Sequence, residues 1–439
     1  MNRNAWICAI LWVIAACLWA FSFKVLWFKP SILPKHRFEE ITHIREKSQN
    51  SNLTDLKPHA FSPDGKNLAI GKSDGTVTIK SLETFKEIVS LPGSNEAVVQ
   101  TWFSPDGKSL AAAHRFGGFF LWNLETRKKI SLPLDGSVRW LGFTADAKLL
   151  LLQDENWKKV LVWDLRAEKI RAILENPEPM HSLALFPNGL ILAGVSKEVK
   201  EGANGKIISI GELILWNVAT GKRQTSFPVD LGKSFYIAAI APDNSHAILG
   251  RADGRGLIIW NIADGKKKAG PTFASVLNFV QYSRDGKTLI TLGDELKTWN
   301  TSSWQEMSTV PAERGWSQSL SDDGHTMAVE DLMPRSEGFV GWFLFLLGAD
   351  QTSYQMVRLW DLKSGNMIAQ LPDASLPLFS PDGKTLATIN RDGFVRLWDI
   401  PPRKNYLRAV GLWTLGLMPL AAGLCWYWFR AKRRPRAIV

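Results

Sequence analysis

Cysteine is scarce in this sequence. Only 3 of the 439 residues are cysteine, and Cys8, Cys17 and Cys425 all lie in two long apolar runs near the ends of the chain. Residues 38–402 hold no thiol, which excludes a disulfide framework and a cysteine-ligated metal site from that region.

Catalytic and cofactor motifs are also lacking. The 7 histidines are scattered singly, without paired metal-ligand spacing. No Gly-x-Ser-x-Gly elbow or phosphate-binding glycine loop is present. The Asp-Gly pairs at Asp74, Asp253 and Asp392 lack calcium-loop spacing and indicate tight turns. The sequence therefore predicts no catalytic residue, cofactor or metal site and favours a non-enzyme, although loops distant in sequence can still build a site.

Acidic residues are absent from both ends of the chain. Residues 1–38 and 403–439 hold 13 of the 53 basic residues and no acidic one. The rest of the chain, residues 39–402, holds the other 40 basic residues and all 42 acidic residues. The excess of basic over acidic residues therefore comes from the two ends of the chain, and a nucleic-acid partner is not expected.

Each end also carries an apolar run. Ala5 to Phe23 is 19 residues without a charge, and Ala409 to Phe429 is 21. Roughly 20 helical residues cross a ~30 Å hydrocarbon core. We expect transmembrane helices at 1–28 and 409–429, separated from a central domain by linkers at 29–37 and 403–408 and followed by a basic tail at 430–439. A cleaved signal peptide and lipoprotein processing at Cys17 are alternatives for the first run.

One pattern repeats between the two runs. Ser380-Pro381-Asp382-Gly383 has the composition of a tight turn, in which the Asp side chain caps the backbone and glycine accepts a positive φ. It is followed by a strand at 385–389, a hairpin at Asp392-Gly393 and a strand at 394–400. Full or weaker copies of the turn begin at seven further positions: Ser62, Ser104, Thr144, Phe186, Ala241, Ser283 and Ser321.

The strand after each hairpin ends in Trp-Asp or a similar pair. Its tryptophans are Trp122, Trp163, Trp216, Trp260, Trp299, Trp360 and Trp398, and the eighth copy has Lys80 instead. A period near 40 residues with a terminal Trp-Asp resembles the WD-repeat β-propeller family. The resemblance covers residues 38–402 and implies an all-β, eight-bladed propeller. The family's Gly-His pair is missing from its usual turn. We expect the tryptophans to pack between blades rather than to bind a ligand.

The last repeat ends at Pro401-Pro402 and has no outer strand of its own. In this family the N-terminal segment commonly supplies that strand, and Phe38 to Ile44 is the candidate. Closure of this kind would leave no open sheet edge and would bring residues 38 and 402 together.

Two repeats carry insertions. Ser196 to Glu212 is expected to be an extended hairpin. Glu330 to Gln355 contains ten consecutive apolar or glycine residues, too few to cross a bilayer. This segment is the predicted partner-binding surface, with packing back onto the propeller and membrane contact as alternatives; its candidate residues are Phe339, Trp342, Phe343, Phe345 and Leu346.

These features favour a membrane-anchored scaffold for protein–protein interaction with an unidentified protein partner. A hydrolase- or lactonase-type propeller enzyme with a site in the central channel and a ligand-sensing ectodomain are the alternatives. Because long loops are translocated largely regardless of charge, we expect an extracytoplasmic propeller and cytoplasmic termini.

Overall fold

The computed structural model describes residues 36–38, 58–115, 118–132, 140–201, 207–230, 235–251, 256–274, 276–310, 317–332, 355–390 and 393–401. Residues His36–Leu397 form one compact unit. A second unit comprises Met1–Lys35 and Trp398–Val439, of which only residues 398–401 are described.

The described residues form β-strands joined by turns and loops. In chain order the strands are β1 (His36–Phe38), β2 (His59–Phe61), β3 (Asn67–Gly71), β4 (Thr76–Ser81), β5 (Glu87–Pro92), β6 (Val98–Phe103), β7 (Ser109–His114), β8 (Phe119–Asn123), β9 (Lys129–Ser131), β10 (Trp140–Phe143), β11 (Leu149–Gln153), β12 (Lys159–Asp164), β13 (Lys169–Glu175), β14 (Met180–Leu185), β15 (Leu190–Glu201) and β16 (Ile207–Asn217). They continue with β17 (Lys222–Asp230), β18 (Phe235–Ile240), β19 (His246–Arg251), β20 (Gly256–Asn261), β21 (Lys267–Thr272), β22 (Phe279–Tyr282), β23 (Thr288–Leu292), β24 (Leu296–Asn300), β25 (Glu306–Val310), β26 (Gln318–Leu320), β27 (Thr326–Leu332), β28 (Gln355–Asp361), β29 (Met367–Pro372), β30 (Ser375–Phe379), β31 (Thr385–Ile389) and β32 (Val395–Asp399).

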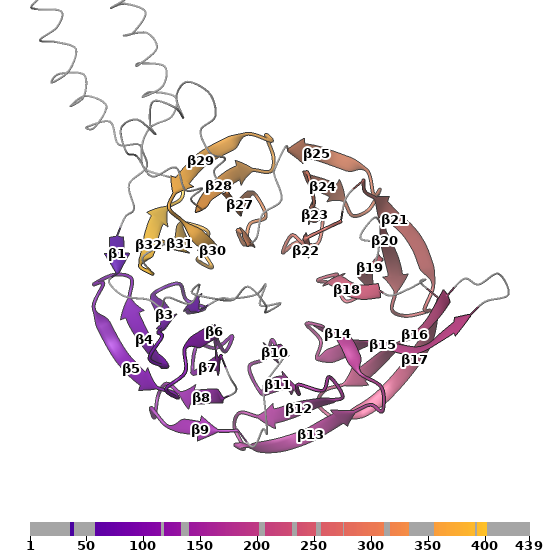
Figure 1. The fold of residues 1–439 in the computed structure, drawn as a ribbon, viewed down its shortest axis with the longest axis horizontal. Helices are drawn as coiled ribbons and strands as arrows, with labels where there is room; N and C mark the ends of the chain where they lie inside the picture. Colours follow the sequence, from indigo (N-terminus) through magenta and orange to yellow (C-terminus); the bar gives the residue numbers. More distant parts are fainter. Residues whose placement is uncertain are drawn as a thin grey trace, which may run out of the picture. The chain divides into compact units, whose positions relative to one another are not determined.

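These strands form eight antiparallel four-stranded sheets. Seven sheets use four consecutive strands, from β2–β5 to β26–β29, and the eighth has the order β1-β32-β31-β30. Within the unit His36–Leu397 the sheets follow one another around a central axis (Figure 1). In the seven consecutive sheets the first strand is innermost and the fourth is at the periphery, and in the eighth sheet β30 is innermost and β1 is at the periphery. The prediction of an eight-bladed all-β propeller is confirmed.

The repeated turn joins the first and second strands of each sheet, and its residues explain its shape. Ser62 Oγ donates to Asp64 Oδ1 (2.5 Å) and accepts from the backbone N–H of Asn67 (2.9 Å). Asp64 Oδ1 also accepts from the N–H of Lys66 (3.0 Å), and Gly65 has φ 68°. The Asp and Gly of the repeat thus serve the turn as predicted, and the Ser hydroxyl makes further hydrogen bonds that the sequence did not predict.

The cores lie between neighbouring sheets. Val98, Leu110 and Trp122 of the second sheet, for example, pack against Ile79 and Leu91 of the first. Similar buried clusters join the following sheets, and Phe61 and Leu68 of the first sheet pack against Ala387 and Leu397 of the last. The ring is therefore closed by side-chain packing as well as by strand pairing.

Strand β1 supplies the outer strand of the last sheet. His36 pairs with Leu397, Arg37 with Arg396 and Phe38 with Val395. Closure by the N-terminal segment is confirmed, but the bounds differ from the prediction. The strand begins inside the predicted linker, and residues 39–44 of the predicted strand lie outside the described residues.

The insertions extend the second and third strands. In the fourth sheet β15 and β16 pair out to Glu201↔Ile207, the extended hairpin that was predicted. In the seventh sheet β27 and β28 pair out to Leu332↔Gln355, and residues 333–354 lie outside the described residues. No helix in the described part of the chain could span a membrane, and the two predicted spans lie outside that part.

Candidate functional site

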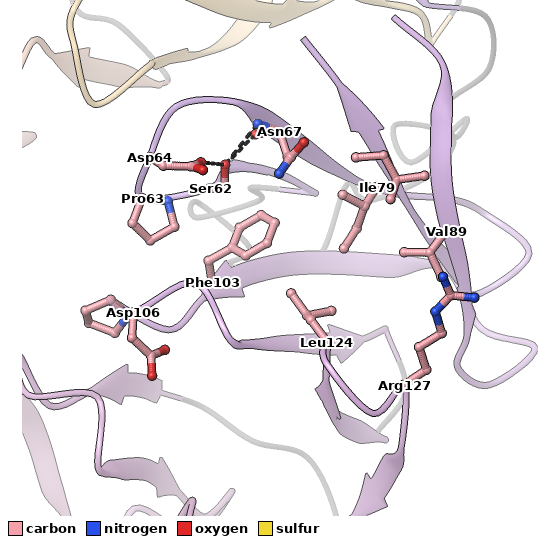
Figure 2. A pocket seen from close by; sticks show the side chains of 13 residues that line it. Ser62, Pro63, Asp64, Asn67, Ile79, Val89, Phe103, Asp106, Leu124 and Arg127 are labelled. Atoms are coloured by element: carbon pink, nitrogen blue, oxygen red, sulfur yellow. Dashed lines mark hydrogen bonds between the residues drawn. The ribbon is translucent and has the colours of Figure 1, made fainter. Parts of the chain in front are cut away.

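A groove opens between the first and second sheets, on the side where the first strand of each sheet turns into the second. Its volume is about 550 Å³, within the range of about 300–1,000 Å³ that is typical of ligand pockets. The side chains that line it are shown in Figure 2. The groove is a candidate binding site.

The floor of the groove is apolar. Ile79 and Val89 contribute from β4 and β5, and Phe103 and Leu124 contribute from the second sheet (Figure 2). All four belong to the core cluster between the two sheets, so the floor is the outer surface of that core. Ile88, beside them, is half exposed. A bound apolar side chain would therefore extend an existing packed layer.

The two ends of the groove carry opposite charges. Asp64 and Asp106 lie in the turns between first and second strands, at the inner end. Arg127 lies in the turn between β8 and β9, at the outer end (Figure 2). The Ser62 hydroxyl and the Lys66 amide donate to Asp64 and lower the pKa of this carboxyl, which keeps it charged.

Arg127 has an unusual backbone conformation. Its φ is 57°, in the left-handed region that favours glycine. The corresponding turns of the fourth, fifth and seventh sheets have Gly221, Gly265 and Gly365 at this position. The first, second, third and sixth sheets have the non-glycine residues Phe85, Arg127, Glu168 and Trp304 with φ between 49° and 59°.

The other three non-glycine residues have partners within the propeller. Phe85 packs against the cluster that closes the ring, Glu168 forms an ion pair with Lys128, and the Trp304 ring contacts His246 at 6.0 Å between centroids. Arg127 forms no ion pair or hydrogen bond with any described residue. Its strained position is therefore not explained by contacts inside the ring, a pattern that points toward function.

The same position between the fifth and sixth sheets is occupied by a hydrogen-bonded chain. Ser245 Oγ donates its single proton to Asp243 Oδ1 (2.7 Å), so it accepts from His246 Nδ1 (2.6 Å). His246 Nε2 is then free to accept from the Tyr282 hydroxyl (2.7 Å). Burial lowers the pKa of His246, which favours the neutral ring that this arrangement requires.

His246, Tyr282 and Trp304 correspond in the repeat to Asn67, Phe103 and Arg127. Between the fifth and sixth sheets two rings meet a histidine, whereas between the first and second sheets Asn67 and an exposed Arg127 stand at the positions of His246 and Trp304. Each interface is thus built on one plan, and side-chain identity determines whether the space is filled.

The predicted partner-binding residues lie outside the described residues; they are Phe339, Trp342, Phe343, Phe345 and Leu346. The seven repeat tryptophans are all buried, at 9% exposure or less. Six of them belong to the clusters between their own sheet and the preceding one: Trp122, Trp163, Trp216, Trp260, Trp299 and Trp360. No group of three or more potential metal ligands occurs among the described residues.

Comparisons with known proteins agree with this geometry. The model of the WD domain, G-beta repeat, matches residues 40–79 and 374–399. The chain is an eight-bladed β-propeller with WD40 repeats at these two segments. The C-terminal WD40 domain of Sif2 is 13% identical, with a TM-score of 0.60 over 84% of this chain and 98% of that one. The computationally designed Ika8 protein is 16% identical, with a TM-score of 0.56 over 78% of this chain and 95% of that one.

At these identities the two structures show the fold alone. No curated protein matches the chain. WD40 propellers are usually non-enzymatic scaffolds that bind other proteins. The groove between blades 1 and 2 was not predicted from the sequence, because its residues come from four separate strands and three turns. One signal was present: Arg127 stands where the copies in blades 4, 5 and 7 have glycine.

Proposed function

We propose that this WD40 propeller is a scaffold tethered to a membrane by a helix at each end, which holds protein partners close to the bilayer. The observation that carries the proposal is the pairing of His36 with Leu397. The chain enters and leaves the ring at one pair of neighbouring residues. Two apolar runs long enough to cross a bilayer flank these residues in sequence, so both helices can enter one small patch of membrane.

The proposed topology has cytoplasmic termini and an extracytoplasmic propeller. Arg3 and the basic tail at 430–439 flank the runs on the outer sides, and similar numbers of basic residues flank them on the inner sides. Because charge orients short flanking segments more than long ones, the short ends are expected to stay in the cytoplasm.

We further propose that the insertion of blade 7 binds the principal protein partner. It follows Leu332 and precedes Gln355, at the ends of β27 and β28 remote from the repeated turns. The β1 entry and β32 exit lie at the turn side of blade 8. The ends of β27 and β28 that flank the insertion therefore lie on the face opposite the one where β1 begins and β32 ends.

The experiment is affinity purification of the full chain from detergent-solubilised membranes of its own cells. Trp342→Ser with Phe345→Ser should abolish recovery of the partner and leave the melting temperature nearly unchanged, because aromatic anchors dominate binding energy. The matched control is Met307→Ser, the loss of a large apolar side chain at an exposed position of the described part of the propeller. A large fall in melting temperature of the double variant would show instead that the insertion packs onto its own propeller.

A further inference from the structure

We propose that the groove between blades 1 and 2 binds an extended peptide segment of a partner protein. The segment would have a large apolar side chain flanked by an acidic residue on one side and a basic residue on the other. The proposal rests on the scaffold function proposed above and adds a second binding surface, on the face opposite the blade 7 insertion.

The apolar anchor follows from the floor of the groove. Phe103 and Leu124 are only partly buried, although they belong to the cluster that joins the two blades. A side chain inserted between them and Val89 would cover apolar surface that the propeller leaves accessible. The matching position between blades 5 and 6 is already filled by the Tyr282 and Trp304 rings around His246. An aromatic or branched aliphatic side chain fits this kind of space.

The acidic residue follows from Arg127. Its guanidinium is exposed at the outer end of the groove and has no carboxylate partner in the described part of the chain. Glu168, at the same position of blade 3, forms an ion pair with Lys128 of blade 2. A carboxylate supplied by a ligand would give Arg127 the type of pair that its counterpart has within the ring.

The basic residue follows from the inner end. Asp64 and Asp106 each use Oδ1 for the turn, accepting from the serine hydroxyl and from a backbone amide. Both side chains are exposed, so the second carboxylate oxygen of each can accept from a ligand. The groove has two carboxylates at its inner end and one guanidinium at its outer end. A bound ligand would therefore place its basic residue at the inner end and its acidic residue at the outer end.

Backbone strain at Arg127 supports a binding role over a structural one. A non-glycine residue at φ 57° is retained at a cost to stability. Glycine would occupy this turn without that cost, as in blades 4, 5 and 7. Replacement by glycine should therefore improve folding and impair binding, a combination that a purely structural residue would not give.

The test uses the full chain in detergent micelles and two fluorescein-labelled peptides, Lys-Ser-Phe-Ser-Glu and its reversed sequence, because the direction of the chain in the groove is not fixed. At least one peptide should bind by fluorescence anisotropy, and replacing its Phe by Ser should weaken binding at least tenfold. Arg127→Glu should weaken binding at least tenfold and should favour the peptide in which Glu is replaced by Lys. Arg127→Gly should also lose binding while its melting temperature rises.

The matched control is Arg166→Glu, the same charge change at an exposed residue of the corresponding turn in blade 3. It should bind as the unaltered protein does. Equal binding by Arg127→Glu and Arg166→Glu, or affinity indifferent to the peptide charges, would overturn the proposal. The scaffold function is tested by a different experiment, the recovery of a partner that depends on Trp342 and Phe345. Loss of the groove proposal would therefore leave the result for the scaffold function unaffected.

Discussion

The indole N–H groups of the repeat tryptophans differ at the scale of single residues. Trp299 Nε1 donates to Thr291 Oγ1 (2.9 Å), a side chain two residues beyond its cross-strand partner Leu289. The matching residues in blades 2 and 4 are Ala112 and Ala193. Four repeat tryptophans have an indole N–H without a hydrogen-bond acceptor among the described residues: Trp122, Trp163, Trp216 and Trp360. Space filling, not this hydrogen bond, is the shared role of the tryptophans.

Ala112→Ser should therefore stabilise the propeller, because the new hydroxyl can accept from Trp122 Nε1. The expected gain is about 1 kcal/mol in the free energy of unfolding, measured by chemical denaturation. Thr291→Val is the matched opposite change. It keeps the shape but leaves Trp299 Nε1 buried without an acceptor, and should cost about 1–3 kcal/mol. Equal effects of the two variants on the free energy of unfolding would contradict a stabilising hydrogen bond from the indole N–H to this hydroxyl.

The hydrogen-bonded chain at His246 makes stability depend on pH. Burial lowers the pKa of His246 in the folded protein, so the unfolded chain binds a proton more readily. Stability from this group is complete above the unfolded pKa of about 6.5 and is lost as pH falls through the lower folded value. His246→Asn, which copies Asn67 of blade 1, should flatten the fall in melting temperature between about pH 7 and 5. An unchanged slope would assign that fall to other groups.

At the scale of elements, the sheets share an irregularity that the sequence did not reveal. The pairing of third and fourth strands shifts register immediately before the repeat tryptophan in blades 3, 4, 6 and 7. Blade 1 has the same shift between Ile79 and Lys80, where the tryptophan is missing. The bulge therefore follows from the strand path toward the tight turn rather than from the indole.

Strand β1 is the element on which closure of the ring depends, and its three residues can be tested directly. Replacing His36, Arg37 and Phe38 by Gly, Pro and Gly should remove the pairing with β32 and expose a sheet edge. We expect a loss of at least about 1 kcal/mol in the free energy of unfolding. The same replacements at Lys432, Arg433 and Arg434 of the tail should have no effect. Equal stability of the two variants would show that packing alone closes the ring.

At the scale of the whole molecule, repetition made the fold predictable from the sequence. Eight copies of one turn and one strand ending specify the blade, and a last repeat without an outer strand specifies closure. The groove and the His246 chain were not predicted, because each joins residues from neighbouring blades whose roles depend on single departures from the repeat. Arg127 and Trp304 in place of glycine were the available signs.

Membrane topology is also a property of the whole molecule. With both termini in the cytoplasm, protease added outside spheroplasts should digest the propeller and leave an epitope on the C-terminal tail intact. The same protease after detergent lysis should remove both, which controls for resistance of the tail itself. Protection of the propeller in intact spheroplasts would reverse the assignment.

The pairing of β1 with β32 has a mechanical consequence. Because His36 and Leu397 pair at the point where the chain enters and leaves the ring, tension that separates the two ends loads this pair first, then Arg37 with Arg396, then Phe38 with Val395. The strands would peel one pair at a time instead of shearing together. The ring thus has a seam that yields to force pulling its two ends apart, while the seven blades with consecutive strands bear no such load.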